Sequence, residues 1–295
     1  MSAPNAPQVD DLPADWPHRS HSRMLAAAGQ RWHVQELGSG PAVLLIHGAG
    51  GSLHSWRDLS PLLAPQFRVI AIDIAGHGYS QKTRFIRAGL NDIAQDIAAL
   101  ARQQNWPIRA IIGHSAGAAI ALRLAQILPL EAVIGLNAAL SNFEGVAGWL
   151  FPAMAKSLSR LPFAAQVVTK FLGHQGQIDQ LLAQTGAQIS AAGRGQYLTL
   201  ARRPAHIAAT LDMMAAWDLS QLLPHLPQIT VPCLLLTGSQ DGAVPHRVSF
   251  DAARALPHAK AQLLHGYGHL IAEEAATEIA PLITDFLAQH LPKAP

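Results

Sequence analysis

The pentapeptide Gly113-His114-Ser115-Ala116-Gly117 constrains the fold of this chain more than any other feature of its sequence. It follows the apolar run 110–112 and precedes an alanine-rich stretch over 118–125, so it lies where a strand turns into a helix. The turn is so sharp that residues two before and two after the serine would collide if they carried a Cβ atom. This context predicts a nucleophile elbow, which holds the Ser115 hydroxyl clear of the backbone at a helix N-terminus.

Short apolar runs recur along the chain and are typical of strands buried on both faces. They cover residues 42–46, 68–72, 110–112, 132–136, 233–236 and 261–264, and residues 31–36 alternate like an edge strand. Helical patterns, for example over 90–100, lie between most of them. The alternation predicts an α/β fold with a mostly parallel central sheet flanked by helices.

The alternation breaks once, and this break predicts the domain organisation. Between about 137 and 231 the sequence offers no good strand candidate, so we expect a helical cap insertion over residues 140–225. The core would then comprise residues 21–139 and 226–295. Before it we expect a poorly ordered N-terminal arm over 1–20 that packs at its end through Trp16. Ligands of open α/β sheets bind at the carboxyl edge of the strands, below such a cap. The side chains expected to line the substrate site are Trp149, Phe151, Met213 and Trp217.

Composition excludes several classes of function. The net charge is only +2 and the 21 Lys and Arg residues are scattered, so we expect no nucleic-acid partner. The single cysteine, Cys233, stands in an apolar run and reads as a buried hydrophobic residue. The first residues lack the pattern of a secretory signal, and no apolar run reaches the roughly 20 residues of a membrane span. We therefore expect a cytoplasmic protein. We also expect no metal site, because the histidines lack zinc-site spacing, and no cofactor.

Two further residues complete a catalytic set with Ser115. A serine hydroxyl needs a base to remove its proton, and that base needs an acid to orient it. Asp241 and His269 each come just past a predicted strand, in the chain order Ser, Asp, His that this topology requires. Taken alone, Asp241 could be an ordinary turn residue and His269 a helix cap. Their joint order and placement predict the triad Ser115, Asp241 and His269.

The glycine-rich segment His47-Gly48-Ala49-Gly50-Gly51 follows the strand 42–46 and predicts an oxyanion hole. The backbone amides of Ala49 and Ala116 would hold the negative charge of the tetrahedral intermediate. A phosphate-binding loop is the rival interpretation, but it would require a lysine that this segment lacks. The loop that begins at Asp73 reads as a structural turn near the mouth of the site.

These motifs together resemble those of the α/β-hydrolase fold enzymes over about residues 22–290. The resemblance implies a serine hydrolase that acts on an ester, thioester or similar acyl compound. A carbon–carbon bond hydrolase or a cofactor-free haloperoxidase-like enzyme uses the same triad and stays compatible. Dehalogenases and epoxide hydrolases of this fold normally carry aspartate at the elbow, so Ser115 argues against both.

A narrower set of phrases is similar to the magnesium-chelatase accessory proteins of bacteriochlorophyll biosynthesis. The set includes segments 15–19, 32–35, 54–59, 113–119, 136–140 and 213–219. The sequence departs from the usual pattern at Ala75, where a proline is common, and at Ala49, where a threonine is expected. The resemblance implies a role around magnesium insertion into protoporphyrin IX, with a small apolar acyl or tetrapyrrole-related ligand and magnesium-chelatase subunits as partners. It also allows peripheral contact with the photosynthetic membrane.

Two hypotheses of different classes therefore stand side by side. The first is an α/β-fold serine hydrolase that serves as a chelatase accessory protein. The second is a non-catalytic accessory protein that binds a tetrapyrrole or a chelatase subunit and retains the triad. An intact triad favours the first, while the apolar composition of the insertion would also suit a flat macrocycle.

Overall fold

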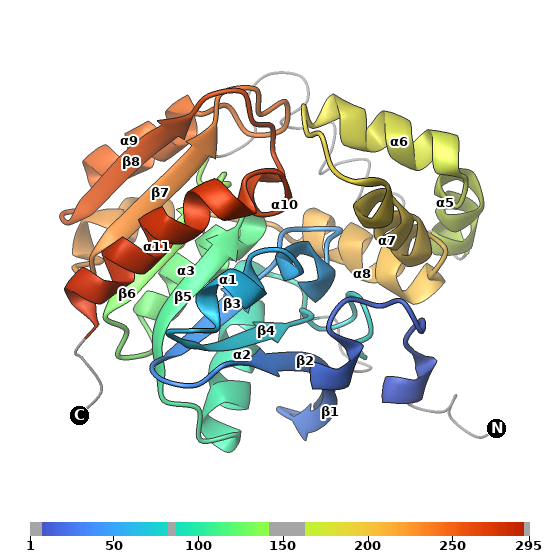
Figure 1. Cartoon of the computed structure of the whole chain (residues 1–295), viewed down its shortest axis with the longest axis horizontal. Coiled ribbons are helices and arrows are strands. Elements are labelled where there is room, and N and C mark those ends of the chain that lie inside the picture. Colours follow the sequence, from blue (N-terminus) through green and yellow to red (C-terminus); the bar gives the residue numbers. More distant parts are fainter. Residues whose placement is uncertain (1–7, 82–86, 142–162, 292–295) are drawn as a thin grey trace.

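A computed structural model describes residues 8–81, 87–141 and 163–291, and within them a single twisted sheet organises the chain (Figure 1). Its strand order is β1-β2-β4-β3-β5-β6-β7-β8. The strands are β1 Ser22–Ala27, β2 Gln30–Leu37, β3 Ala42–Ile46, β4 Arg68–Ile72, β5 Ile108–His114, β6 Ala132–Leu136, β7 Cys233–Gly238 and β8 Ala259–Leu264. All pairings from β4 through β3 to β8 are parallel, while β1–β2 and β2–β4 are antiparallel. The predicted mostly parallel sheet is confirmed.

The edge of the sheet differs from the sequence-based expectation. The segment 31–36 belongs to β2, which is not an edge strand, because β1 pairs with its outer side. The two strands are joined by a tight turn in which Ala28 and Gly29 both have positive φ, 52° and 71°. Met, Leu and Ala dominate β1 and favour helices over strands, so local composition did not reveal it.

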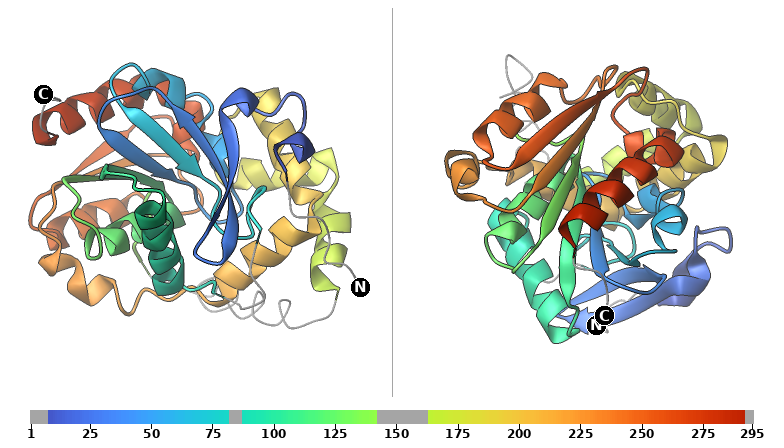
Figure 2. Two further views of the ribbon diagram at one scale, coloured as in Figure 1. Left: turned by 90° about the horizontal axis from the view of Figure 1, so that it is seen from below. Right: turned by 60° about the vertical axis from the view of Figure 1, so that its left-hand side comes forward.

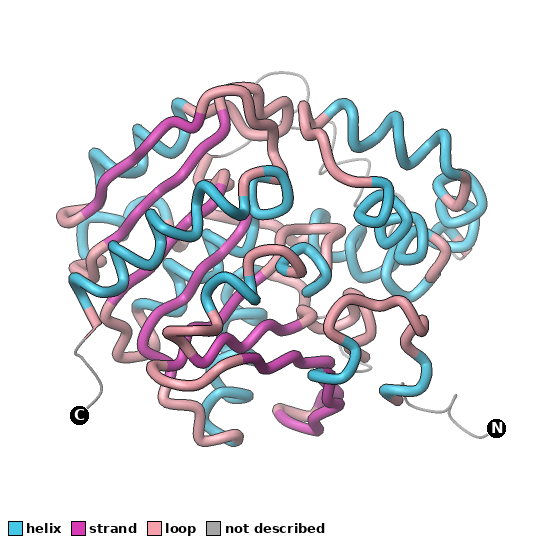
Figure 3. The backbone as a smooth tube through the Cα atoms, viewed as in Figure 1, coloured by secondary structure: helices cyan, strands magenta, loops and turns pink. Residues whose placement is uncertain are grey.

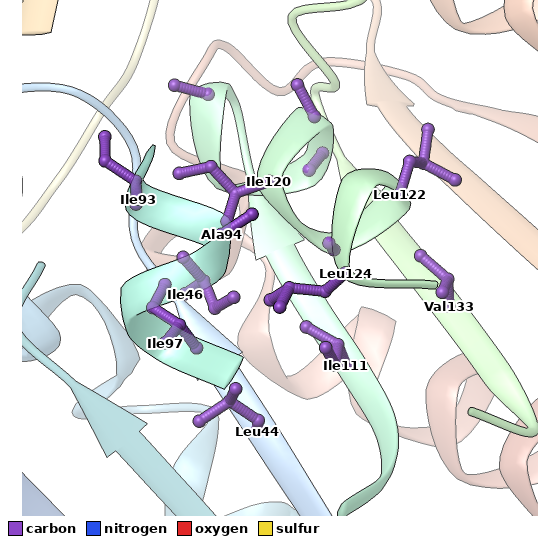
Figure 4. Packing of buried hydrophobic residues seen from close by; sticks show 14 of the residues in the cluster. Leu44, Ile46, Ile93, Ala94, Ile97, Ile111, Ile120, Leu122, Leu124 and Val133 are labelled. Carbon is purple, nitrogen blue, oxygen red and sulfur yellow. The ribbon is translucent and has the colours of Figure 1, made fainter. Parts of the chain in front are cut away.

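The parallel strands from β4 to β7 are buried on both faces because helices cover each side. Alternate residues of β3 show this, since Leu44 and Ile46 enter one hydrophobic cluster and Val43 and Leu45 enter the other. Figure 4 shows the first cluster, in which Leu44 and Ile46 pack with side chains from two helices and the neighbouring strands. Near-continuous apolar strands are the expected outcome of this double burial. The edge strand β8 differs from the prediction for the run 261–264, because Lys260 and Gln262 are exposed.

The helices of the core divide between the two faces (Figure 2). α2 Leu90–Gln103, α3 Ala116–Ala125 and α9 Arg247–Ala255 contribute to the first cluster. The short α1 Ser60–Leu63 and α10 Ile271–Glu274, the 3-10 turn η3 Leu53–Trp56 and the long α11 Ala276–His290 contribute to the second. The core thus has three layers, with the sheet in the middle.

Between β6 and β7 the described part of the chain contains helices and loops only (Figure 3). The helices are α5 Ala164–Leu172, α6 Gln175–Gln184, α7 Ala191–Ala201 and α8 Pro204–Ala215, followed by the 3-10 turn η4 Leu223–Gln228. In Figure 1, α5 to α8 form a group of their own beside one end of the sheet. No helix among the described residues is long and apolar enough to cross a membrane.

The N-terminal segment packs against the core through Trp16, as expected. This indole is 4% exposed and lies edge-on to Tyr79, with ring centroids 5.1 Å apart. Two short 3-10 turns, η1 Val9–Asp11 and η2 Arg19–His21, flank it before β1 begins. From η1 onward the arm is folded against the core, so the expectation of a poorly ordered arm was wrong for these residues, because Leu12 and Trp16 are both buried in one cluster.

Candidate active site

Ser115 stands at a strained turn between β5 and α3. Its backbone has φ 52° and ψ −116°, a conformation that non-glycine residues adopt rarely and mostly at functional sites. A Cβ on Gly113 would overlap the carbonyl of Gly117, and one on Gly117 would overlap the carbonyl of Ile46. The predicted collision around the serine is confirmed, and both flanking positions therefore require glycine.

The elbow is fastened to the neighbouring strand. The Ser115 N–H donates to the Leu136 carbonyl at 2.9 Å, and the Ser115 carbonyl accepts from the Ala139 N–H at 3.1 Å. Ser115 is half-buried, so its hydroxyl stays within reach of a ligand. These bonds hold the strained turn in one place.

The glycine-rich loop after β3 packs directly on the elbow. A Cβ built on Gly48 would lie 3.0 Å from the Ser115 Cβ, which shows how closely the two segments approach. His47 fixes the loop, because its Nε2 accepts from the Ile74 N–H at 2.9 Å and its Nδ1 donates to the Gly48 carbonyl at 2.7 Å. Burial lowers the pKa of His47, which agrees with this neutral, two-sided role.

Two backbone amides of this region stay available for a ligand. Among the hydrogen bonds between described residues, neither the Ala49 N–H nor the Ala116 N–H has an acceptor. Ala116 is the first residue of α3, where backbone amides lack partners within the helix. Ala49 is exposed at the tip of the loop. The arrangement is compatible with the predicted oxyanion hole.

Asp241 and His269 form a close hydrogen-bonded pair at the carboxyl ends of β7 and β8. The His269 Nδ1 donates to the Asp241 Oδ2 at 2.8 Å. The other carboxylate oxygen accepts the amides of Ala243 and Val244, each at 2.8 Å. The side chain of Asp241 is fully buried, and that of His269 is 10% exposed. The carboxylate thus accepts three hydrogen bonds, and the bond from Nδ1 fixes the imidazole tautomer.

His114 connects this pair to the elbow. Its Nε2 donates to the His269 carbonyl at 2.7 Å, and the two imidazole rings lie with centroids 4.9 Å apart. Burial lowers the pKa of His114 to about 3, so the ring is neutral at physiological pH. From its position inside the elbow, His114 was expected to contribute only local packing. The structure shows that it brings His269 next to the residue that precedes Ser115.

Asn137 is a second residue that the sequence reasoning missed. It follows β6, is fully buried and has positive φ, 46°. Its Nδ2 donates to the carbonyls of Gly268 and His269 at 2.9 and 2.6 Å, and its Oδ1 accepts from the Gly238 N–H at 2.8 Å. Its position just past a strand, at the same sheet edge as Asp241 and His269, was the signal that could have revealed it.

Asp73 has the structural role that its sequence context indicates. It accepts from the His33 Nδ1 at 2.7 Å and from the amides of Leu53 and Tyr79 at 2.7 and 2.8 Å. Burial alone would raise its pKa, but the His33 imidazole and these donors outweigh it and lower the pKa to about 2. The carboxylate thus joins three segments of the core.

The region between β6 and β7 contacts the site through main-chain and side-chain polar groups. The Thr185 carbonyl, at the end of α6, accepts the amides of both Gly242 and His269 at 3.1 Å. His206 of α8 accepts from the Gly78 N–H at 3.0 Å and donates to the Gly50 carbonyl at 3.2 Å. Neither contact was foreseen, because each depends on how a helix far along the chain is placed.

The four residues expected to line the substrate site are placed as follows. Trp149 and Phe151 lie outside the described residues. Met213 is 1% exposed and belongs to the first hydrophobic cluster, and Trp217 packs partly buried against the same cluster. Both have packing partners in the core, and their proximity to substrate stays a prediction.

Metal-binding and thiol chemistry receive no support from the geometry. In the ranges 8–81, 87–141 and 163–291, no group of three or more His, Cys, Asp or Glu side chains is placed to hold a metal ion. Cys233 is buried in β7, and this burial raises the pKa of its thiol to about 12. The thiol therefore stays protonated and poorly nucleophilic.

Comparison with known proteins agrees with the fold described above. A family model described as alpha/beta hydrolase fold matches residues 41–276. A thermophilic esterase from Thermogutta terrifontis, solved with malate bound, superposes with a TM-score of 0.70 at 22% identity, covering 92% of this chain and 99% of that chain. At this identity the likeness concerns the fold, and it confirms the predicted fold class.

Two sequence relatives narrow the comparison. The "Magnesium-chelatase 30 kDa subunit" of Rhodobacter capsulatus is 46% identical over 94% of this chain and 98% of its own length. The "Pimeloyl-[acyl-carrier protein] methyl ester esterase" of Vibrio vulnificus strain YJ016 is 30% identical over 76% of this chain and 86% of its own length. One relative thus carries the name of a chelatase subunit and the other that of an ester hydrolase.

Proposed function

We propose that this chain, which belongs to the alpha/beta hydrolase fold family and within it to the family of the magnesium-chelatase 30 kDa subunit, is a serine hydrolase of an acyl ester-type bond. The observation that carries the proposal is the 2.8 Å pair of Asp241 and His269, fastened beside the strained elbow of Ser115. The esterase relative supports the choice of an ester bond.

The chemistry follows from the roles of these side chains. The His269 Nε2 accepts the proton of the Ser115 hydroxyl as the serine Oγ attacks the carbonyl carbon of the ester. Asp241 holds the imidazole in the required tautomer and stabilises the imidazolium that forms. The amides of Ala49 and Ala116 donate to the oxyanion, and a donor of this kind lowers the barrier by about 2.7–4 kcal/mol.

Collapse of the tetrahedral intermediate breaks the bond to the leaving alcohol, which receives the proton from His269. The acyl group then remains on Ser115 as an ester. Water attacks this acyl-enzyme while His269 accepts a proton from it, and the same proton returns to the Ser115 oxygen as the acid leaves. No cofactor is needed for this series of reaction steps.

A series of p-nitrophenyl esters with increasing acyl length tests the proposal. We expect saturable hydrolysis by the wild-type chain and a loss of about 10³-fold or more in kcat for Ser115→Ala. The variant must keep the wild-type circular dichroism and urea midpoint, which shows that only the nucleophile was removed. Equal activity of Ser115→Ala and wild type would contradict the proposal.

The chelatase-subunit relative favours a second level of function. We infer that the hydrolase acts as an accessory protein in magnesium insertion into a tetrapyrrole, with chelatase subunits as partners. The alternative is that the accessory role needs only binding. A phototrophic strain that lacks its own copy separates these cases, because Ser115→Ala would restore pigment if binding suffices and would fail if hydrolysis is required. Fractionation of the same strain tests the expected cytoplasmic location and membrane contact.

A further inference from the structure

The loop that carries His269 has every main-chain amide of three consecutive residues engaged. The Gly268 N–H donates to the Glu274 Oε2 at 3.2 Å, and the Leu270 N–H donates to the Glu274 Oε1 at 3.1 Å. Between them, the His269 N–H donates to the Thr185 carbonyl at 3.1 Å. The loop is thus held on one side by a carboxylate and on the other by the end of α6.

Glu274, the last residue of α10, binds beyond its own short helix. Its carboxylate accepts from the N–H of Leu270, the residue that precedes α10. The same carboxylate also reaches the Gly268 N–H and, from the helical region, the Gln188 N–H at 2.9 Å. One carboxylate therefore ties residues on both sides of His269 to the segment between α6 and α7. Hydrogen bonds to an ionised acceptor are roughly twice as strong as neutral ones.

The segment 184–188 packs closely on the loops that carry Asp241 and His269. Gly186 has φ 74°, and a Cβ at this position would overlap the Gln240 carbonyl, next to Asp241. A Cβ on Gly268 would in turn overlap the backbone of Gly186. With the Thr185 carbonyl bound to both Gly242 and His269, the segment spans the acid and the base.

We propose that Glu274 is a positioning residue for the base His269, and that segment 184–188 completes the same clamp. The inference rests on the proposed function, since it assigns these groups to the alignment of His269 with Ser115. A displacement of about 1 Å in such a group can cost 10²-fold in rate. The helical region at this end is therefore part of the catalytic scaffold and not a freely opening lid.

The first test is Glu274→Gln, which keeps the size of the side chain but replaces one acceptor oxygen by an amide group. The matched control is Glu278→Gln, because Glu278 accepts from the Tyr267 hydroxyl near the same loop without binding its amides. We expect Glu274→Gln to lower kcat for p-nitrophenyl esters about tenfold or more with KM nearly unchanged. The control should stay within twofold of wild type. Both are assayed well below the unfolding transition, so that stability alone does not change kcat.

The second test addresses segment 184–188 through Gly186→Ala, whose methyl group would push the segment off Gln240. The control is Gly176→Ala in α6, where a Cβ meets no atom within 4 Å. We expect a fall in kcat for Gly186→Ala and wild-type kcat for Gly176→Ala. Wild-type kcat in both Glu274→Gln and Gly186→Ala would overturn the proposal.

A spectroscopic arm separates this proposal from the proposed function. In a proton NMR spectrum, the Nδ1 proton between His269 and Asp241 should give a low-field resonance that disappears in His269→Ala. We expect the resonance to broaden or vanish in Glu274→Gln and to persist in Glu278→Gln. If the wild-type chain hydrolyses no ester, the proposed function fails, and this resonance alone decides whether Glu274 positions the imidazole. A resonance unchanged in Glu274→Gln would overturn the clamp.

Discussion

Replacing Asn137 by alanine should weaken both the fold and the catalytic loop. The buried amide makes three hydrogen bonds, to the Gly268 and His269 carbonyls and from the Gly238 amide. Each bond contributes about 1 kcal/mol net, and leaving a buried partner unpaired costs about 1–3 kcal/mol. Alanine is also less suited than asparagine to the left-handed backbone at this position, at a cost of roughly 1 kcal/mol. We therefore expect a loss of about 3–5 kcal/mol in the free energy of unfolding.

The assay is urea unfolding followed by circular dichroism, together with ester hydrolysis at a temperature where the variant is folded. We expect a lower urea midpoint and a reduced kcat, because the His269 carbonyl would keep only the His114 donor. Asn137→Asp keeps the left-handed preference and the acceptor for Gly238, but it brings a carboxylate against two carbonyls, so it should be no better than alanine. A midpoint and a kcat equal to wild type in Asn137→Ala would refute the reasoning.

Three further predictions address the elbow, the buried histidines and the cysteine. Gly117→Ala would overlap the Ile46 carbonyl, so we expect loss of folded protein in expression and unfolding assays, and a well-folded, active variant would contradict this. Burial lowers the pKa of His114 to about 3 and of His206 to about 4, so from pH 6.5 down to 4 the unfolded chain binds more protons than the folded one. The free energy of unfolding should therefore fall over this window by about 1.4 kcal/mol per pH unit for each histidine, and the urea midpoint should fall with it. A urea midpoint that stays constant over this window would contradict the prediction. The Cys233 thiol, with its pKa raised to about 12, should react with a thiol reagent only upon unfolding, which rapid labelling of the native chain would disprove.

Much of the core could be predicted because its signals are local. The run 42–46 is apolar at every position since it is buried on both faces, and it became β3 with these same bounds. The elbow could also be predicted from local sequence, because the pentapeptide lies between an apolar run and a helical pattern. The collision at Gly113 occurs within five residues, whereas the collision at Gly117 involves Ile46 of β3. The proximity of Asp241 and His269 followed from a rule of topology, that the carboxyl ends of parallel strands meet at one edge, and their catalytic role stays a prediction.

What could not be predicted depends on contacts between distant segments. β1 has a helix-favouring composition and becomes a strand only because β2 offers it an edge. Glu274 reads as an ordinary acidic residue of a helix start, and its role depends on Gly268 and Gln188 reaching it from two other segments. Thr185 acts through its carbonyl, which no side-chain pattern can indicate. The residues that support the site are therefore harder to predict from sequence than the proposed catalytic residues.

The most direct measurement is the mapping of a fluorophosphonate adduct by mass spectrometry of peptides from the native chain. We expect a single adduct on Ser115, formed far more slowly in His269→Ala and absent in Ser115→Ala. An adduct at another residue, or labelling of Ser115→Ala at the wild-type rate, would show that the hydroxyl at the elbow is not the activated nucleophile.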